Sequence, residues 1–172
     1  MSKRLLSICI PTYNRDRFLD EAIESIVSQI TDDIKDKVEI CISDNASTDN
    51  TDKVIEKWKE KSPIPIIYSK NEENLGFDRN MLKVIEIANG EYCWSLGSDD
   101  KIEEGGLKYV LSKIEHDTNI DIFVLTQNGY TYDFSKNVKF SSHPLLSLEA
   151  DVVFKSLEDT CWYSYALGYI SI

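Results

Sequence analysis

The chain has 172 residues and carries 19 Lys and Arg against 30 Asp and Glu, a formal net charge of −11 at pH 7. With 42% hydrophobic and 28% charged residues, it has the composition of a globular domain with one well-filled core. The acidic excess argues against a nucleic-acid or anionic-membrane binder, whose affinity comes from clustered Lys and Arg, but allows one phosphate-bearing ligand that arrives with a divalent cation.

Strand and helix patterns alternate along most of the chain. Short apolar runs predict strands, and apolar residues that recur every three or four positions predict helices. The predicted strands are residues 5–10, 38–42, 65–68, 91–96 and 121–125. The predicted helices are residues 16–30, 49–61, 81–88 and 107–114, the last with Glu103 and Glu104 in its first turn.

This alternation is typical of right-handed βαβ crossovers, so we expect an α/β fold with a mostly parallel sheet flanked by helices. After the fifth strand the pattern changes, and residues 130–132 and 138–140 are typical of a hairpin. A short helix over 146–158 and an apolar end at 167–172 are expected beyond it. No apolar run approaches the roughly 20 residues of a membrane helix, no signal peptide is evident, and we expect a single domain over residues 1–172.

The cysteines indicate a reducing compartment. Cys9, Cys41, Cys93 and Cys161 are far apart in the sequence and form no CxxC pair. A zinc site or a redox pair is therefore not expected. The first three lie within apolar runs, where a free cysteine behaves as a small core residue. We expect a cytoplasmic protein.

Polar, turn-prone segments follow four of the predicted strands. In open α/β sheets ligands bind beyond the carboxyl ends of the strands, and right-handed crossovers place these ends on one edge. The segments are residues 11–15, 43–47, 71–76 and 97–100. We therefore expect them to form one cleft that contains carboxylates, amides, hydroxyls and an aromatic ring.

The sharpest feature of this edge is the pair Asp99 and Asp100. Adjacent carboxylates after a buried strand repel each other unless a cation or hydrogen-bond donors compensate. Oxygen ligands suit Mg²⁺ or Mn²⁺, which takes one or two carboxylates and completes its shell with water and substrate phosphate. The alternative is that Ser98, Asp99 and Asp100 cap the following helix, where Ser and Asp are favoured.

Four further side chains have both a binding and a structural interpretation. Asp44 and Asn45 suit a nucleotide base or ribose, but an Asx turn into the second helix also explains them. Tyr13 is placed to stack on a base, unless it packs on the core. Arg79, at the start of the third helix, is placed to bind a diphosphate, unless it forms a surface ion pair. The sequence has no GxxxxGK[ST] or GxGxxG motif, which argues against a P-loop or Rossmann dinucleotide site.

Five motifs occur in a definite order along the chain. They are residues 6–15, residues 43–51, residues 74–76 with 79–80, residues 88–92 and residues 97–100. Their order and spacing, over about residues 5–125, resemble the family-2 glycosyltransferases of the GT-A fold. The Ser-Asp-Asn and Gly-Ser-Asp-Asp variants are most similar to the branch that adds sugars, including dideoxyhexoses of the abequose type, to bacterial surface polysaccharides.

The resemblance implies a nucleotide-diphosphate-sugar donor held together with Mn²⁺ or Mg²⁺. It implies nucleotide-sugar contacts at Pro11, Thr12, Tyr13, Asp44, Asn45, Arg79 and Asp99. Asp99 and Asp100 match the metal-binding DXD region of the family. Gly97 departs from that region, where the family frequently has Asp, so that either Asp99 or Asp100 is the principal ligand. Asn45 departs from the second Asp of the family's Asp-Asp-Gly-Ser motif, which leaves the identity of the base open.

The resemblance also implies a metal-dependent, inverting transfer to a glycan or lipid-linked saccharide, with a carboxylate as general base. Late acids such as Asp151, Glu158 and Asp159 match no motif of the family, so the catalytic base is not identified. We expect the chain to stop before the acceptor-binding part, with the base beyond residue 172. Acceptors of this family often lie at the cytoplasmic membrane face, and membrane association would then depend on that missing part, because no basic amphipathic helix is evident here.

Two other classes of protein remain open. A sugar nucleotidyltransferase has a similar nucleotide-binding sheet but needs a Gly-rich, basic loop after the first strand, which residues 11–14 do not provide. A nucleotide-binding but inactive fragment of a glycosyltransferase is consistent with a missing acceptor part. Only an active transferase releases a nucleoside diphosphate from a nucleotide sugar, so turnover separates the classes.

Overall fold

A computed structural model of the chain describes residues 4–116, 129–130 and 137–138. The chain divides into two compact units, Met1–Thr118 and Asn119–Ile172. All predicted site residues lie in the first unit. The predicted strand over 121–125, the helix over 146–158 and the apolar end at 167–172 lie outside the described residues, and the single domain over the whole chain stays a prediction.

The first unit is built on a four-stranded parallel sheet in the order β3-β2-β1-β4. Its strands are β1 (Leu6–Thr12), β2 (Val38–Asp44), β3 (Ile66–Lys70) and β4 (Tyr92–Ser95). Every residue of β1 and β2 is buried, because these strands lie in the middle of the sheet and are covered on both faces. The predicted α/β class with a mostly parallel sheet is confirmed.

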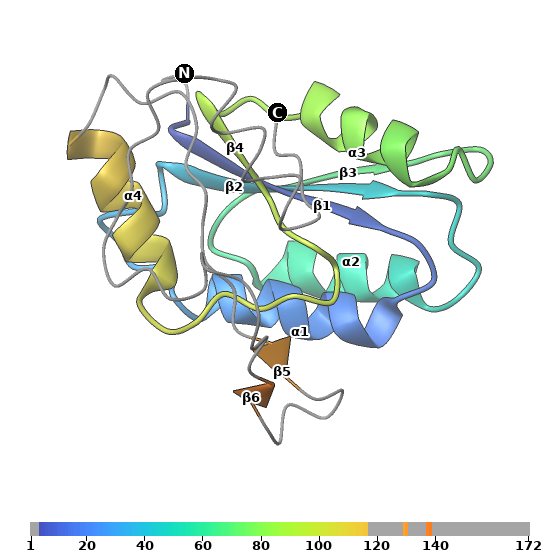
Figure 1. Cartoon of the computed structure of the whole chain (residues 1–172), viewed down its shortest axis with the longest axis horizontal. Helices are drawn as coiled ribbons and strands as arrows, with labels where there is room; N and C mark the ends of the chain where they lie inside the picture. Colours follow the sequence, from blue (N-terminus) through green and yellow to red (C-terminus); the bar gives the residue numbers. More distant parts are fainter. Residues whose placement is uncertain (1–3, 117–128, 131–136, 139–172) are drawn as a thin grey trace. The chain divides into compact units, whose positions relative to one another are not determined.

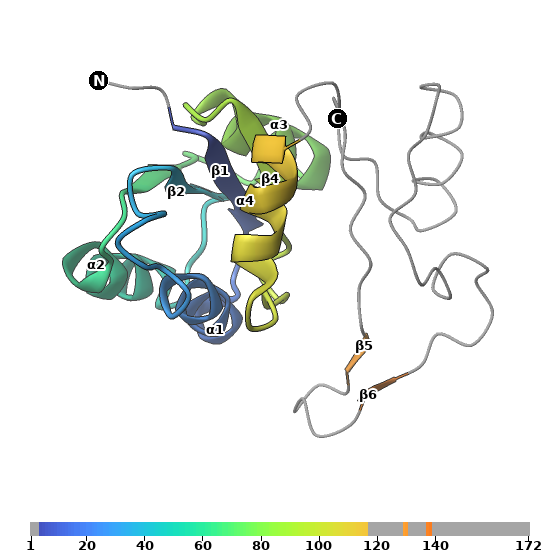
Figure 2. The ribbon, with the colours of Figure 1, turned by 90° about the vertical axis from the view of Figure 1, so that its left-hand side faces the viewer.

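Helices cover both faces of this sheet. Figures 1 and 2 show α1 (Asp16–Val27) and α2 (Thr51–Lys61) on one face and α3 (Phe77–Glu86) on the other, where α3 packs on β1 and β2. α4 (Gly106–His116) follows β4 in the chain. Each helix buries apolar side chains, as the helical periodicity predicts, among them Leu19, Ile23, Ile26, Ile55, Trp58, Val84, Leu107 and Leu111.

β1 runs farther than predicted, through Pro11 to Thr12. Pro11 lacks an N–H and would normally interrupt a central strand. β4 pairs with β1 only as far as Cys9, whose carbonyl accepts the last bond on that side from the N–H of Leu96 at 3.0 Å. The backbone nitrogen of Pro11 therefore points to the side on which β1 no longer has a neighbouring strand. The missing N–H removes no hydrogen bond from the described sheet.

α4 begins at Gly106, one residue before the predicted range of 107–114, and has no acid in its first turn. The placement of Glu103 and Glu104 in that turn is therefore wrong. Gly105, with a φ of +82°, redirects the chain just before the helix, and few residues other than glycine adopt that angle readily.

The turn at Asn89 and Gly90 positions β4 at the far end of the sheet. Ser7 Oγ accepts from the N–H of Gly90 at 2.8 Å and donates to the buried carboxylate of Glu39 at 2.7 Å. Glu39 also accepts from the N–H of Asn89 at 2.8 Å. A Cβ at Gly90 would lie 2.6 Å from the backbone nitrogen of Ser7, so this close approach needs glycine. The motif over residues 88–92 is therefore explained by packing.

The described cysteines are all free. Cys9 and Cys41 are buried side by side in β1 and β2, as predicted for core residues. Hydrogen bonding to Cys41 and Cys93, together with burial, raises the pKa of the Cys9 thiol and keeps it protonated. Cys93 is exposed, so its placement in the core is wrong. Cys161 lies outside the described residues.

Of the second unit, the structure describes two short strands. β5 (Gly129–Tyr130) and β6 (Asn137–Val138) pair antiparallel, with Gly129 opposite Val138 and Tyr130 opposite Asn137. This pairing agrees with the predicted hairpin, although both strands begin one residue earlier than predicted.

Candidate functional site

Asn14 joins the loops that follow β1 and β2. Its N–H donates to Ser47 Oγ at 2.9 Å, and its Oδ1 accepts from the N–H of Thr48 at 2.8 Å. Asn14 has a φ of +51°, a left-handed conformation in which Asn is more common than most residues. A second link runs from the N–H of Asp16 to Asp49 Oδ2 at 3.0 Å. The two loops, which the sequence predicted to share one edge, are therefore bonded to each other.

Asp44 ends β2 and is fully buried, and both of its oxygens have partners. Oδ1 accepts from the N–H of Ser47 at 2.8 Å, which is the turn contact of the structural interpretation. Oδ2 accepts from the Tyr68 hydroxyl at 2.8 Å and lies 3.6 Å from Lys70 Nζ. The Tyr68 hydroxyl also lies 2.7 Å from Asp52 Oδ1. Burial of the hydroxyl, and then the carboxylates of Asp52 and Asp44, raise the pKa of Tyr68. A nucleotide base at Asp44 would therefore share Oδ2 with Tyr68.

Asn45 anchors the loop that follows β3. Its side-chain N–H groups donate to Asn74 Oδ1 at 2.7 Å and to the carbonyl of Gly76 at 3.3 Å. Its Oδ1 accepts from the N–H of Leu75 at 2.8 Å and from Asn71 Nδ2 at 3.2 Å. An ionised Asp, which the family has here, provides no donor for the first two bonds. The departure at Asn45 is thus explained by its contacts with this loop.

Asn80 lies in the motif over residues 79–80, but the sequence analysis gave it no role of its own. It is buried in the second turn of α3, where its Oδ1 accepts from Ser43 Oγ at 2.8 Å and from Asn71 Nδ2 at 2.9 Å. Its Nδ2 donates to the carbonyl of Ser43 at 3.0 Å and lies 3.5 Å from that of Thr12. The available signal was an amide on the buried side of α3, one turn before the buried Val84.

Pro11, Thr12 and Tyr13 differ in what they offer a ligand. Pro11 is buried inside β1. Thr12 is also buried, and its Oγ1 has no hydrogen-bond partner among the described residues. A buried hydroxyl without a partner is costly, so it marks a position where a ligand group or water fits. Tyr13 is 44% exposed, so part of its side chain is open to a ligand.

Residues 97–100 form a tight turn in which the N–H of Asp100 donates to the carbonyl of Gly97 at 3.0 Å. Because α4 begins only at Gly106, Asp99 and Asp100 do not cap it, and the capping interpretation is wrong. A Cβ at Gly97 would lie 2.6 Å from Asp100 Oδ2 and 3.2 Å from Asp99 Oδ1. Both carboxylates therefore approach one point above Gly97, and the Asp that the family frequently has there would collide with Asp100.

The electrostatics of this turn suit a cation. Burial, and then the charge of Asp99, raise the pKa of Asp100. No group of three His, Cys, Asp or Glu able to hold a metal occurs among the described residues, so a metal here would have at most two carboxylate ligands from them. Mg²⁺ and Mn²⁺ are commonly held by one or two carboxylates, with water and phosphate as the remaining ligands. The pair above Gly97 fits such an ion.

Two arginines flank the predicted site. Arg15, which the sequence analysis did not select although it lies within the segment 11–15, forms an ion pair with Asp99. This contact links the loops after β1 and β4. Arg79 is exposed in the first turn of α3 and forms no ion pair with any described residue, so nothing described supports a surface ion pair as its role.

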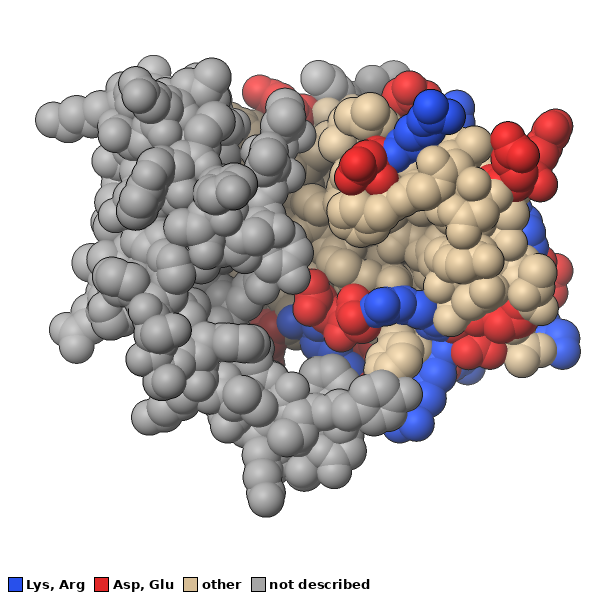
Figure 3. Space-filling view, turned by 45° about the vertical axis from the view of Figure 1, so that its right-hand side comes forward, with Lys and Arg blue, Asp and Glu red and all other residues tan. Residues whose placement is uncertain are grey.

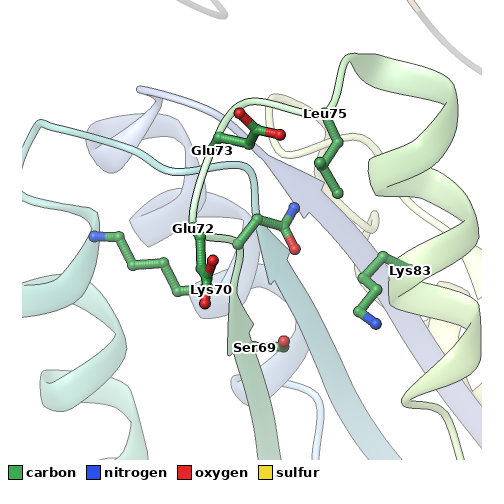
Figure 4. Close-up of a pocket in the computed structure, with 7 residues that line it drawn as sticks. Ser69, Lys70, Glu72, Glu73, Leu75 and Lys83 are labelled. Atoms are coloured by element: carbon green, nitrogen blue, oxygen red, sulfur yellow. The ribbon is translucent and has the colours of Figure 1, made fainter.

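A polar cavity of about 350 Å³ lies beside the end of β3 (Figure 4). Its lining is Ser69, Lys70, Asn71, Glu72, Glu73, Leu75 and Lys83. In Figure 4 Lys83 reaches from α3 toward β3, whereas the amine of Lys70 points away. None of the predicted binding residues lines this cavity, and its mixed charges select no particular ligand.

A parallel sheet with helices on both faces, and with bonded loops at the carboxyl ends of its strands, defines an α/β domain of the class that binds ligands at this edge. Residues 7–167 match the family Glycosyl transferase family 2. The chain belongs to this family, as the motif order predicts.

Characterised relatives come from bacteria. The chain is 45% identical over 120 residues to abequosyltransferase RfbV of Salmonella typhimurium, an overlap of 70% of this chain and 35% of that protein. It is 30% identical over 149 residues to the minor teichoic acid biosynthesis protein GgaB of Bacillus subtilis, covering 84% of this chain and 16% of that protein. The chain thus spans about a third or less of the length of these relatives.

Solved structures share the fold. The match to Staphylococcus aureus TarS residues 1–349 in complex with UDP has a TM-score of 0.59 and 28% identity, over 64% of this chain and 32% of that chain. A mannosyltransferase of Pyrobaculum calidifontis, solved with GDP-Man and Mn²⁺, has a TM-score of 0.60 and 22% identity, over 70% of this chain and 34% of that chain. The likeness to the second protein concerns the fold alone.

Proposed function

We propose that this chain binds a nucleotide-diphosphate sugar and transfers the sugar to a glycan or lipid-linked saccharide in the synthesis of a bacterial surface polysaccharide. The observation that carries the proposal is the turn over residues 97–100, where two carboxylates approach one point at the edge that the other three loops form. Family membership supports the same activity.

The residues proposed to bind the nucleotide sugar follow from the exposure and the polar groups of each side chain. Tyr13 has an exposed ring for a base, and Thr12 has a buried hydroxyl without a described partner. Asp44 and Asn45 are buried at the end of β2, and Pro11 is buried within β1. Arg79 is exposed and has no ion pair with a described residue, and its guanidinium suits the bidentate geometry of a phosphate. TarS, a relative in fold and sequence, was solved with UDP, which supports a nucleotide diphosphate as ligand.

Asp99 and Asp100 would hold Mn²⁺ or Mg²⁺. Such an ion supplies Lewis-acid stabilisation of the leaving nucleoside diphosphate. In this proposal the chain's own side chains position the donor, with Asp99 also close to the ribose and Arg79 against the diphosphate. The transfer would be inverting, and its general base remains unassigned, because Asp151, Glu158 and Asp159 lie outside the described residues.

The reaction would take place in the cytoplasm, at the inner face of the membrane if the acceptor is lipid-linked. Among the described residues, no helix has the length and apolar character needed to cross a bilayer. The name of GgaB, a minor teichoic acid biosynthesis protein, supports an acceptor that belongs to a cell-surface polymer. The name of RfbV, an abequosyltransferase, supports the transfer of a sugar.

A second candidate is nucleotide binding without sugar transfer. It is favoured by the positions of the proposed donor and metal residues, which all lie between residues 11 and 100, while no catalytic base is identified. The family match does not favour the third class, a sugar nucleotidyltransferase.

The test is incubation of the purified chain with Mn²⁺ and a panel of nucleotide sugars, followed by assay of the released nucleoside diphosphate. Release that requires Mn²⁺ supports the transferase, and Asp99→Ala and Asp100→Ala are each expected to abolish it. Thermal stabilisation by a nucleoside diphosphate with Mn²⁺, but without turnover, would favour the second candidate. If no nucleotide stabilises the chain with or without metal, both candidates are refuted.

A further inference from the structure

Arg15 provides the positive charge at the carboxylate pair. It extends from the loop after β1 and pairs with Asp99 Oδ2 in the turn after β4. The side chains of Arg15 and Asp99 are 46% and 50% exposed, so solvent reaches the pair. Neither Asp99 nor Asp100 has another ion pair among the described residues. The guanidinium therefore does in this structure what a divalent ion would do, because it compensates two adjacent negative charges.

A guanidinium and a divalent ion cannot share this position easily. Both would need the same carboxylate of Asp99, and two positive charges about 4 Å apart repel each other even near the protein surface. Arg15 must therefore move from Asp99 before an ion takes that carboxylate as a ligand. A diphosphate would give Arg15 another anionic partner and so lower the cost of that move.

We propose that Arg15 competes with the divalent ion for Asp99, so that the site binds the ion weakly by itself and strongly together with a diphosphate. This inference rests on the proposed function, since it assumes that Asp99 and Asp100 hold the metal. Arg15 is then a positioning residue that couples two ligands: each raises the affinity of the other, as linkage requires.

The test is a titration of the full chain with Mn²⁺ alone, followed by electron paramagnetic resonance of the free ion. Arg15→Gln is expected to bind Mn²⁺ about tenfold more tightly than the unaltered chain, because a competing charge is gone. Arg15→Lys keeps the charge and should remain close to the unaltered chain. Arg17→Gln is the matched control, because Arg17 lies two residues away and pairs only with Glu21 among the described residues.

A gain in affinity is the decisive result, since a damaged fold lowers metal affinity and does not raise it. Equal or weaker Mn²⁺ binding by Arg15→Gln would overturn the inference while leaving the proposed function intact. If neither the unaltered chain nor Arg15→Gln binds Mn²⁺, but nucleoside diphosphates raise the melting temperature, the inference also fails and nucleotide binding stands. Absence of both effects refutes the proposed function together with the inference.

Discussion

Asparagine side chains make most of the contacts between loops at the carboxyl edge of the sheet. Asn14 accepts from Thr48 through Oδ1, while Asn45 and Asn80 each donate and accept through one amide. A carboxylate of the same shape would only accept, and a hydroxyl would offer a single donor. The amide is therefore the side chain that can bond two loops at once, and it leaves the carboxylates of Asp99 and Asp100 for charge.

Asp100 lowers the stability of the metal-free protein. Burial and the charge of Asp99 raise its pKa, which means that folding disfavours the ionised form. This destabilisation is present at neutral pH and disappears as the pH falls and the carboxyl is protonated. Asp100→Asn should therefore raise the free energy of unfolding in EDTA at pH 7, measured by urea denaturation.

The control for this prediction is Asp99→Asn, which also removes a charge but loses the ion pair with Arg15. Because that pair is half exposed, the control should change stability little. A lower free energy of unfolding in Asp100→Asn would contradict this prediction. It would mean that contacts in the folded chain stabilise the carboxylate of Asp100.

Ala46 is strained, with a φ of +64° at the place where the family motif has Gly. A left-handed conformation costs a residue with a Cβ about 1–2 kcal/mol, and glycine avoids this cost. Part of that gain in stability is lost, because the unfolded chain is more flexible at a glycine. Ala46→Gly should raise the free energy of unfolding by about 0.5–1 kcal/mol in denaturant titrations. Ala22→Gly, at a buried position inside α1, should have the opposite sign. Destabilisation by both substitutions would show that Ala46 is not strained.

At the scale of elements, the loops after the four strands are bonded in a chain. Asn14 connects the loops after β1 and β2, Asn45 connects those after β2 and β3, and Arg15 connects those after β1 and β4. Asn80 adds a connection from α3 to the ends of β1 and β2. The position of each loop therefore depends on its neighbours.

Asn80→Ala should disturb this arrangement strongly. The substitution removes four contacts from a residue that is 3% exposed and leaves the buried hydroxyl of Ser43 without its partner, while Asn71 keeps its bond to Asn45. Unpaired buried groups cost about 1–3 kcal/mol each, so we expect a loss of about 2–4 kcal/mol in the free energy of unfolding. Asn50→Ala, at an exposed position before α2, should cost less than about 1 kcal/mol. Equal effects of both substitutions would contradict the role of Asn80.

The sequence predicts the elements and the edge of the site well, because both follow from local rules. Apolar periodicity identifies β1 and α1, and right-handed crossovers place the loops together. The extension of β1 past Pro11 could not be predicted, since it depends on where β4 stops pairing. The partners of Arg15 and Asn80 are likewise tertiary contacts between distant residues, and no local pattern encodes them.

At the scale of the whole molecule, the chain carries a formal net charge of −11. On the face in Figure 3, acidic and basic side chains of the described residues are interspersed. Acids outnumber bases nonetheless, so the folded chain repels itself and repels a free diphosphate over distances of about a Debye length. A divalent ion held by Asp99 and Asp100 would neutralise their two negative charges, and this would allow an acidic chain to hold a diphosphate.

The same repulsion predicts how salt acts on stability. Raising NaCl from about 20 mM to about 200 mM shortens the Debye length from roughly 20 Å to below 10 Å and screens the repulsion among surface acids. The melting temperature of the chain at pH 7 should therefore rise with salt. Near pH 4.6, the isoelectric point calculated from the sequence, the net charge vanishes and the rise should vanish with it. If salt instead lowers the melting temperature at pH 7, exposed ion pairs such as Lys37–Glu115 outweigh the net repulsion, and the charge alone does not account for a metal requirement.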